Sequence, residues 1–137
     1  METILAIVKR AGGWHPGLHL KIENLIYMAL IIEALDESGP MGLPALSVAH
    51  DGEQNGDLMR DPEMCFELGF AGGARLDPFY FRNDYLGTEQ WSRTIVHGQY
   101  VALLDLHRQH ECFAAEWDRN LTLQGFAEAF TDAAICS

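Results

Sequence analysis

Oxygen-bearing side chains in the stretch HDGEQNGDLMRDPEM, residues 50–64, follow the first part of a calcium-binding loop. An EF-hand loop needs oxygen ligands at its first, third and fifth positions, glycine at the sixth and a bidentate glutamate at the twelfth. The early positions are filled by Asp51, Glu53, Asn55 and Gly56. The twelfth position is Pro62, which has no side-chain ligand, and both flanks have the composition of strands. The pattern therefore predicts a hairpin and no calcium site.

The Asn-Gly pair at 55–56 is among the strongest short-range signals for a hairpin turn. Side-chain polarity then indicates the register of the two strands. A two-residue turn would place Val48 opposite Glu63, whereas one additional residue places Val48 opposite Met64. Because a slip of one residue exchanges the two faces of a strand, we expect a three-residue or bulged turn over residues 55–57.

Acidic side chains crowd this hairpin, and Arg60 is the one base among them. The acids are Asp51, Glu53, Asp57, Asp61, Glu63 and Glu67. Like charges packed this closely cost stability, so we expect the cluster to bind a basic partner. The alternative interpretation is that these acids only form a solvated surface.

A second group of candidate ligands lies in HRQHE, residues 107–111. His107 shares a helical face with His110 or Glu111, because residues three or four apart are neighbours on a helix. Helical zinc motifs read HExxH or HxxEH, whereas the order here is HxxHE, and no second ligand helix with an ExxH pattern is visible. We interpret His107 as a core histidine and expect neither a metal nor a cofactor.

Other catalytic patterns are missing from the sequence. A restriction-type nuclease needs an acid two residues before a catalytic lysine, but Lys9 and Lys21 follow Ile7 and His19 at that spacing. Neither GxSxG nor GxxxxGK[ST] is present. Cys112 lies near two histidines, yet nothing else indicates a thiol nucleophile, and we interpret it as a buried helix cysteine. These observations predict a protein that is not an enzyme.

Aromatic residues form a third candidate group, at FYF (79–81) and at two later positions. Such rings line binding grooves because they present a large apolar body with a polar edge. We therefore expect Tyr80, Tyr85 and Trp91 to belong to a partner-binding surface. Packing in the core or at a sheet edge is the alternative.

Alternation of apolar and polar residues predicts about five strands that position these groups. Leu18, Leu20 and Ile22 share one face of a half-buried strand. Residues 27–35 are apolar on both faces, as in a central strand. Further strands are expected at 44–50, 64–70 and 74–86. Pro78 restricts the last of these to an edge or a bulge.

Helical periodicity is found at both ends of the chain. Residues 2–11 are apolar at helical spacing, and Gly12-Gly13 ends the run as a C-cap would. From Gln99 a second helix is expected, with an interruption near Asn120 and a shorter helix after Gly125. Its apolar face would carry Tyr100, Leu103, Leu104, His107, Phe113 and Trp117. The element order predicts a single α+β domain over residues 1–137, with a mostly antiparallel sheet and helices packed on one face.

The net charge of the chain limits the kinds of partner that it can bind. The 137 residues include 20 acids and 9 bases, a formal net charge of −11. Such a chain repels nucleic acid and anionic lipid, so we expect no direct nucleic-acid binding and no membrane binding. The three cysteines are widely spaced without CxxC, which fits reduced thiols. The N-terminus has neither the charge order of a signal peptide nor the length of a span, and we expect a soluble, cytoplasmic protein.

Three blocks of sequence also resemble a known family. They are KIEN (21–24), EQNGDLMRDPEMCFEL (53–68) and WDRNLTLQGF (117–126). In that order they resemble an uncharacterised family of small bacterial proteins, a domain of unknown function carried on plasmids and integrative conjugative elements. Leu25-Ile26 stands where the family has prolines, and Asp51 where an aromatic residue is more usual. The family has no established catalytic residues, so the resemblance implies a genomic context and no mechanism.

Charge and resemblance together give three hypotheses for the function. The leading one is a non-enzymatic inhibitor of a host nucleic-acid-handling defence complex, of the anti-CRISPR or anti-restriction type, which in some cases mimics the charge of DNA. Its acids would contact a basic surface of a host nucleic-acid-binding protein. The second is a structural or regulatory adaptor of the mobile element that binds through the aromatic surface. The third is a metal-dependent hydrolase that uses His107, His110, Glu111 or the hairpin carboxylates.

Overall fold

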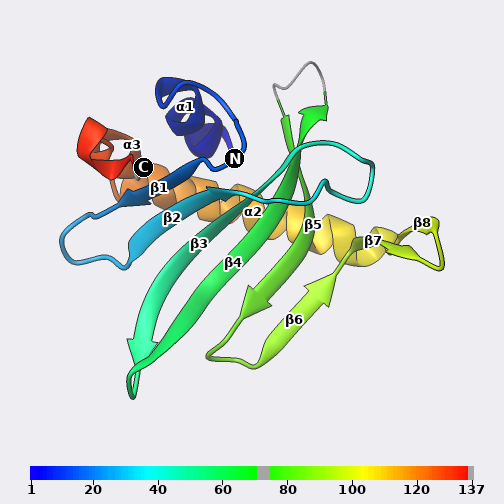
Figure 1. Ribbon diagram of the computed structural model, residues 1–137. Coiled ribbons are helices and arrows are strands. Elements are labelled where there is room, and N and C mark those ends of the chain that lie inside the picture. Colours follow the sequence, from blue (N-terminus) through cyan, green and yellow to red (C-terminus); the bar gives the residue numbers. More distant parts are fainter. Residues whose placement is uncertain (71–74, 136–137) are drawn as a thin grey trace.

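The computed structural model of the chain describes residues 1–70 and 75–135. Within them the chain has the expected α+β architecture, with a six-stranded antiparallel sheet and a separate two-stranded ribbon (Figure 1). The sheet contains β1 (His19–Ile22), β2 (Ala29–Ala34), β3 (Ala45–Gln54), β4 (Asp57–Phe70), β5 (Arg75–Asn83) and β6 (Thr88–Trp91). The ribbon pairs β7 (Arg93–Val96) with β8 (Gln99–Ala102). The helices are α1 (Glu2–Arg10), α2 (Leu104–Leu123), α3 (Phe126–Ala129) and the 3-10 turn η2 (Asp132–Ala134).

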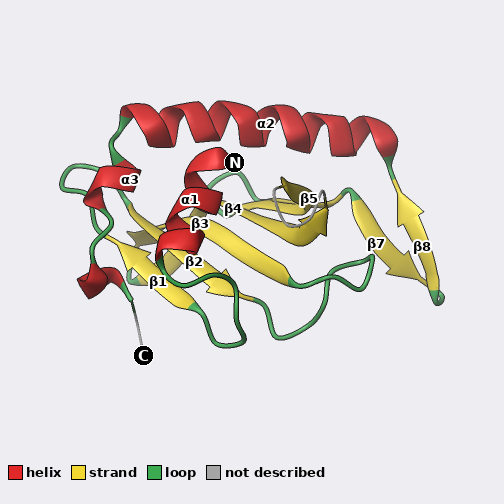
Figure 2. Cartoon of the chain, turned by 90° about the horizontal axis from the view of Figure 1, so that it is seen from above, coloured by secondary structure: helices red, strands yellow, loops and turns green. Residues whose placement is uncertain are grey.

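Each strand of the sheet pairs with its neighbours in the sequence, in the order β1-β2-β3-β4-β5-β6. The helices lie on one side of the sheet, as predicted, with α2 extended across it and α1 and α3 beside α2 (Figure 2). The loop between β2 and β3, residues 35–44, crosses the opposite side, which we call the open face (Figure 1). Among the described residues, no helix combines the length and apolarity required to cross a membrane.

Alternate residues of β1 to β4 point toward the helices and form the core. They are Leu20, Ile22, Leu30, Ile32, Leu46, Val48, Met64 and Phe66, all fully buried. This period of two is what a strand with one buried face requires. The helices contribute Ile4 and Ile7 from α1 and Trp117 and Leu121 from α2. The expected faces of β1, β3 and β4 are therefore confirmed.

The helix α1 is closed and anchored by backbone groups at both ends. Its last turn ends at Gly12 and Gly13, whose φ angles of 102° and 92° suit glycine, as expected for a C-cap. At its first turn, the N–H of Thr3 donates to Oδ1 of Asp118 at 3.0 Å. Asp118 lies on α2, 115 positions further along the chain. This contact joins the start of the chain to its last long helix.

The β3–β4 hairpin has the predicted register, but the residue that shifts the register lies in a strand and not in the turn. Val48 pairs with Met64, as expected. The turn itself has two residues, Asn55 and Gly56, with φ angles of 53° and 84° as in a type I′ turn, because Gln54 pairs directly with Asp57. The additional residue lies inside β4, where Asp61 and Pro62 together oppose the single residue between Ala49 and Asp51. The expected three-residue turn over 55–57 is thus wrong, and a β-bulge supplies the shift.

Pro78 also lies at a bulge, one of the two positions predicted for it. Cys65 pairs with Tyr80 and Phe66 pairs with Pro78, so Phe79 is the unpaired residue. Since β6 covers the outer edge of β5, Pro78 is not on an edge strand.

The region from Gln99 differs from the expected helix. Residues 99–102 form β8, joined to β7 by a turn at His97 and Gly98 with φ angles of 51° and 77°. Consequently α2 begins at Leu104, and Tyr100, Leu103 and Leu104 are exposed. The buried face of α2 consists of His110, Ala114, Trp117 and Leu121, and the helix continues through Asn120 to Leu123. The shorter helix after Gly125 is confirmed as α3.

Candidate functional site

The acidic hairpin is less free than its sequence predicts. Asp57 is exposed at the tip, but Asp61 accepts a hydrogen bond from Asn83 Nδ2 at 2.7 Å, and Glu63 accepts one from Ser47 Oγ at 2.6 Å. Asp51 is half-buried, and its pKa is raised because burial disfavours the charged carboxylate. The side chain of Glu53 lies outside the described part of the structure. Much of the predicted cluster therefore stabilises the sheet itself.

Glu67 is fully buried, which contradicts its expected place on the hairpin surface. Its side chain points to the open face, but the β2–β3 loop covers it there. Its carboxylate accepts the N–H groups of Met41 and Leu43 at 2.9 and 3.2 Å, and Arg93 Nη1 lies 2.6 Å away. A buried carboxylate with two backbone donors and a guanidinium is a satisfied structural group. The partners lie 24 to 26 residues away, so the local sequence could not indicate them.

The open face carries a groove beside this covered glutamate. Its floor contains Cys65, Phe79 and Tyr80, one wall is the first part of the β2–β3 loop, and the other wall is formed by Trp91 and β7. The volume of about 630 Å³ lies in the range typical of ligand sites. The rings of Tyr80 and Trp91 lie 4.4 Å apart between centroids at 56°. Two of the three predicted aromatic residues are thus brought together in one groove.

Carboxylates surround the groove. Asp36 and Glu37 are exposed on the loop wall, and Glu63 lies at the floor of the groove. Glu89 of β6 pairs with Arg82 of β5 in the sheet. Burial first, and then the negative charges of Glu89 and Glu63, raise the pKa of Tyr80 to about 12. The groove therefore combines an aromatic lining with negative potential.

Tyr85, the third predicted aromatic residue, lies outside the groove. It is on the β5–β6 loop, and its hydroxyl approaches Gly52 so closely that a Cβ there would lie 2.8 Å from the oxygen. The ring is partly exposed near the hairpin tip. Tyr80 itself is mostly buried, so Trp91 offers the larger accessible surface.

The helix motif at 107–111 divides between two sites. His107 Nε2 lies 2.9 Å from Asp77 Oδ1 and its Nδ1 lies 3.3 Å from Glu111 Oε1. One ligand atom from each of these residues falls within 4.8 Å of the others, a spacing that fits a metal ion. However, Arg93 already pairs with Asp77 at 3.2 Å, and Arg75 with Glu111 at 3.2 Å. The arginines neutralise both carboxylates, which favours a structural charge network.

His110 belongs to a separate buried group. Its Nδ1 accepts a hydrogen bond from Ser92 Oγ at 2.9 Å, and its Nε2 donates to Gln90 Oε1 at 3.1 Å. The arrangement resembles a nucleophile and its base, but Ser92 and His110 are only 1% and 3% exposed. Burial, and then the charge of His107, lower the pKa of His110 to about 4, which makes it a weak base. The group fastens α2 to the β6–β7 segment.

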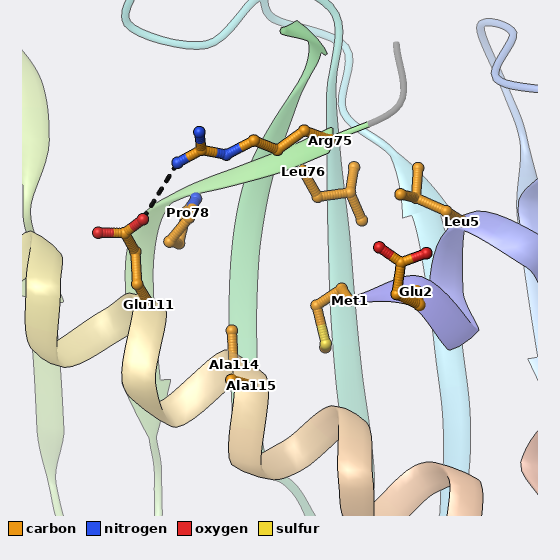
Figure 3. A pocket seen from close by; sticks show the side chains of 9 residues that line it. All are labelled: Met1, Glu2, Leu5, Arg75, Leu76, Pro78, Glu111, Ala114 and Ala115. Carbon is orange, nitrogen blue, oxygen red and sulfur yellow. Dashed lines mark hydrogen bonds and ion pairs between the residues drawn. The ribbon is translucent and has the colours of Figure 1, made fainter. Parts of the chain in front are cut away.

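A smaller cleft lies between α1, α2 and β5 (Figure 3). Its volume is about 170 Å³, and Met1, Leu5 and Leu76 supply apolar walls. The ion pair between Arg75 and Glu111 lies along one side (Figure 3). The cleft is too small for a drug-sized ligand.

Comparison with known proteins assigns the family. Residues 2–127 match the family described as Domain of unknown function (DUF6908). The chain belongs to this family. No match was found among curated proteins or among solved structures. The expected membership of an uncharacterised family is confirmed.

In this DUF6908 domain, several polar residues that shape the candidate site gave no signal in the sequence. Arg93 and Asp77 act through partners on other strands, and Asp36 and Glu37 belong to a turn-rich loop whose path over the open face is a tertiary property. Cys112 was expected in the core but is exposed on α2. Of the two cysteines within the described residues, Cys65 is the buried one, and burial raises the pKa of its thiol.

Proposed function

We propose that this chain is a non-enzymatic binding protein of a mobile genetic element that inhibits a host nucleic-acid-handling defence complex, of the anti-CRISPR or anti-restriction kind. It acts in the cytoplasm, where its acidic open face contacts a basic surface of that complex. The basic surface is one that otherwise holds phosphate. The observation that carries the proposal is the partition of charge over the described residues.

Basic side chains are largely occupied by acids of the same chain. Within the described residues, the pairs are Lys21–Glu23, Arg60–Glu63, Arg75–Glu111, Arg82–Asp84, Arg93 with Glu67 and Asp77, and Arg108–Asp105. Asp36, Glu37, Asp57 and Glu89 have no ion-pair partner among those residues. These acids lie on the groove wall, at the hairpin tip and on β6. The excess of negative charge is thus available to a basic partner, whose approach it would accelerate.

Charge reversal on the open face tests the proposal. Tagged protein is incubated with bacterial host lysate at low and at high salt, and captured proteins are identified by mass spectrometry. We expect a basic nucleic-acid-binding protein whose capture weakens with salt, because exposed charges are screened. The variant Asp36→Lys/Glu37→Lys should lose it. The matched control Glu116→Lys/Glu128→Lys makes the same charge change on the helical side, at exposed residues, and should retain it.

Defence inhibition needs its own readout. Plasmid transformation efficiency is measured in strains with one defined CRISPR or restriction system, with and without the protein. Restored transformation by the wild type and the helical control, but not by Asp36→Lys/Glu37→Lys, supports the inhibitor. Capture that is indifferent to both salt and charge reversal contradicts it.

The exposed ribbon favours a second candidate, an adaptor that binds through β7 and β8 instead of the aromatic surface expected from the sequence. Ile95 and Val96 of β7 and Tyr100 and Val101 of β8 are between 37% and 50% exposed, and Leu103 follows at 54%. Cross-strand pairing places Ile95 and Tyr100 on one face of the ribbon and Val96 and Val101 on the other. Exposed apolar side chains on both faces of a ribbon mark a protein-binding surface. An adaptor that binds through the ribbon associates independently of salt, and Ile95→Ser/Val101→Ser abolishes that association.

A further inference from the structure

The groove on the open face combines two features that recognise cations, and this inference rests on the protein-binding function proposed above. Trp91 is 48% exposed and is supported from below by Tyr80. An accessible indole face attracts a cationic group through its quadrupole. The carboxylates of Asp36, Glu37 and Glu63 also line the groove, and their negative charge attracts a cationic group as well.

No basic side chain lines the groove among the described residues. Arg60 lies 3.6 Å from Glu63, and it pairs with that carboxylate alone among the acids that line the groove. Arg82 is held by Asp84 at 2.6 Å and also hydrogen-bonds the side chain of Tyr80 on the groove floor. The acids of the loop wall, Asp36 and Glu37, are therefore the groove carboxylates without an ion-pair partner among the described residues.

We propose that this groove binds an arginine side chain presented by an extended basic segment of the partner protein. The guanidinium stacks on Trp91 while its N–H groups donate to the carboxylates of Asp36 and Glu37. Arginine suits both contacts because its planar fork stacks on aromatic rings and matches carboxylate geometry. The remaining volume accepts the neighbouring residues of the segment against Leu35 and Ile95.

The position of the indole makes the test specific. Trp14 is half-buried and Trp117 is 5% exposed, so Trp91 is the most exposed of the three tryptophans. NMR resolves the indole N–H signals of the three tryptophans. The probe is the peptide acetyl-Gly-Leu-Arg-Leu-Gly-amide, compared with the same peptide that carries citrulline, a neutral isostere of arginine.

We expect the arginine peptide to shift the Trp91 indole signal and to bind at least about tenfold more tightly than the citrulline peptide. Glu37→Gln should weaken binding of the arginine peptide severalfold, and Trp91→Leu should remove it. The control Glu116→Gln, on the far side of α2, should leave it unchanged. Circular dichroism confirms that the variants fold.

Two results overturn the inference. One is equal affinity for the arginine and citrulline peptides, and the other is a peptide response confined to the hairpin tip around Asp57. If capture from the lysate depends on Asp57 while the Trp91 indole signal does not shift with the arginine peptide, the proposed function stands and the groove assignment fails. If the peptide binds as expected but no basic partner is captured, the groove assignment stands and the proposed function fails.

Discussion

Arg93 joins three parts of the chain through one guanidinium. Its Nη1 lies 2.6 Å from Glu67, its Nη2 lies 3.2 Å from Asp77, and its Nε donates to the carbonyl of Pro78 at 3.1 Å. Both Arg93 and Glu67 are nearly inaccessible to water. Removing one member of such a pair leaves an uncompensated buried charge, which costs more than the pair itself contributes.

Arg93→Met should therefore lower the free energy of unfolding by about 3–5 kcal/mol. The double variant Arg93→Met/Glu67→Gln should recover much of this loss, because glutamine can still accept the N–H groups of Met41 and Leu43. Urea denaturation measures both. Arg108→Met, which removes an exposed ion pair with Asp105, is the control and should change stability by less than about 1 kcal/mol. Equal effects at Arg93 and Arg108 would contradict the buried network.

At the scale of single residues, backbone preferences can be predicted from the sequence, whereas the surroundings of a side chain cannot. Asn55-Gly56 formed the turn that its backbone preferences predict. Glu67 follows several other acids along the chain, so the sequence predicts a surface position for it. Its burial depends on a loop and on Arg93, both distant along the chain. Local polarity contains no information about such partners.

The β2–β3 loop is the element that defines both the buried glutamate and the groove. The backbone of Gly39 packs against the side chain of Glu67, and a Cβ on residue 39 would overlap Cγ of the glutamate. The same loop supplies Asp36 and Glu37 to the groove wall. Its path is therefore fixed by a close contact that only glycine permits.

Gly39→Ala should displace this loop and lower the free energy of unfolding by about 1–3 kcal/mol, as overpacking usually does. It should also reduce affinity for the arginine peptide, since the groove wall moves. Ser38→Ala, at the exposed neighbour, serves as control and should have little effect on either quantity. Denaturation and the indole signal of Trp91 provide the measurements. Unchanged stability of Gly39→Ala would show that the loop does not pack on Glu67.

The sequence pattern predicts β1 to β5 near their observed positions but does not predict β6, β7 and β8. Strands β1, β3 and β4 follow apolar alternation, and β2 is apolar on both faces. Strands β6, β7 and β8 have four residues each and show no clear apolar period. Tyr100, Leu103 and Leu104 continue the helical spacing of α2, so the sequence predicts a helix where β8 is found. The groove could not be predicted, because β7 forms one of its walls.

At the scale of the whole molecule, the helices and the open face have different chemistry. The helical side buries the apolar core together with His50 and His110, and burial lowers the pKa of both histidines. The open face carries the acids and the groove. Protonation of these two histidines therefore opposes folding at acid pH.

Stability should fall on acidification from pH ~7 to ~4.5. The pKa of His110 is about 4 in the folded state and about 6.5 when unfolded, so the unfolded chain binds the additional proton in this range. The stabilisation is complete above the unfolded pKa and is lost toward the folded pKa, about 2 kcal/mol for this residue. The raised pKa of Asp51 acts in the opposite direction. Urea titrations across pH should show a flatter profile in His110→Gln, and identical profiles would contradict the assignment.

The order of the strands has a consequence for how the chain folds. Every pairing in the sheet connects strands that follow one another in the sequence, so each hairpin can form after closing only its own short loop. Topologies rich in such local contacts fold quickly. The contact between Thr3 and Asp118 closes 115 residues and gains its stability only once the sheet exists. Docking of α1 against α2 is therefore expected as the last step, after a sheet assembled hairpin by hairpin during or soon after synthesis.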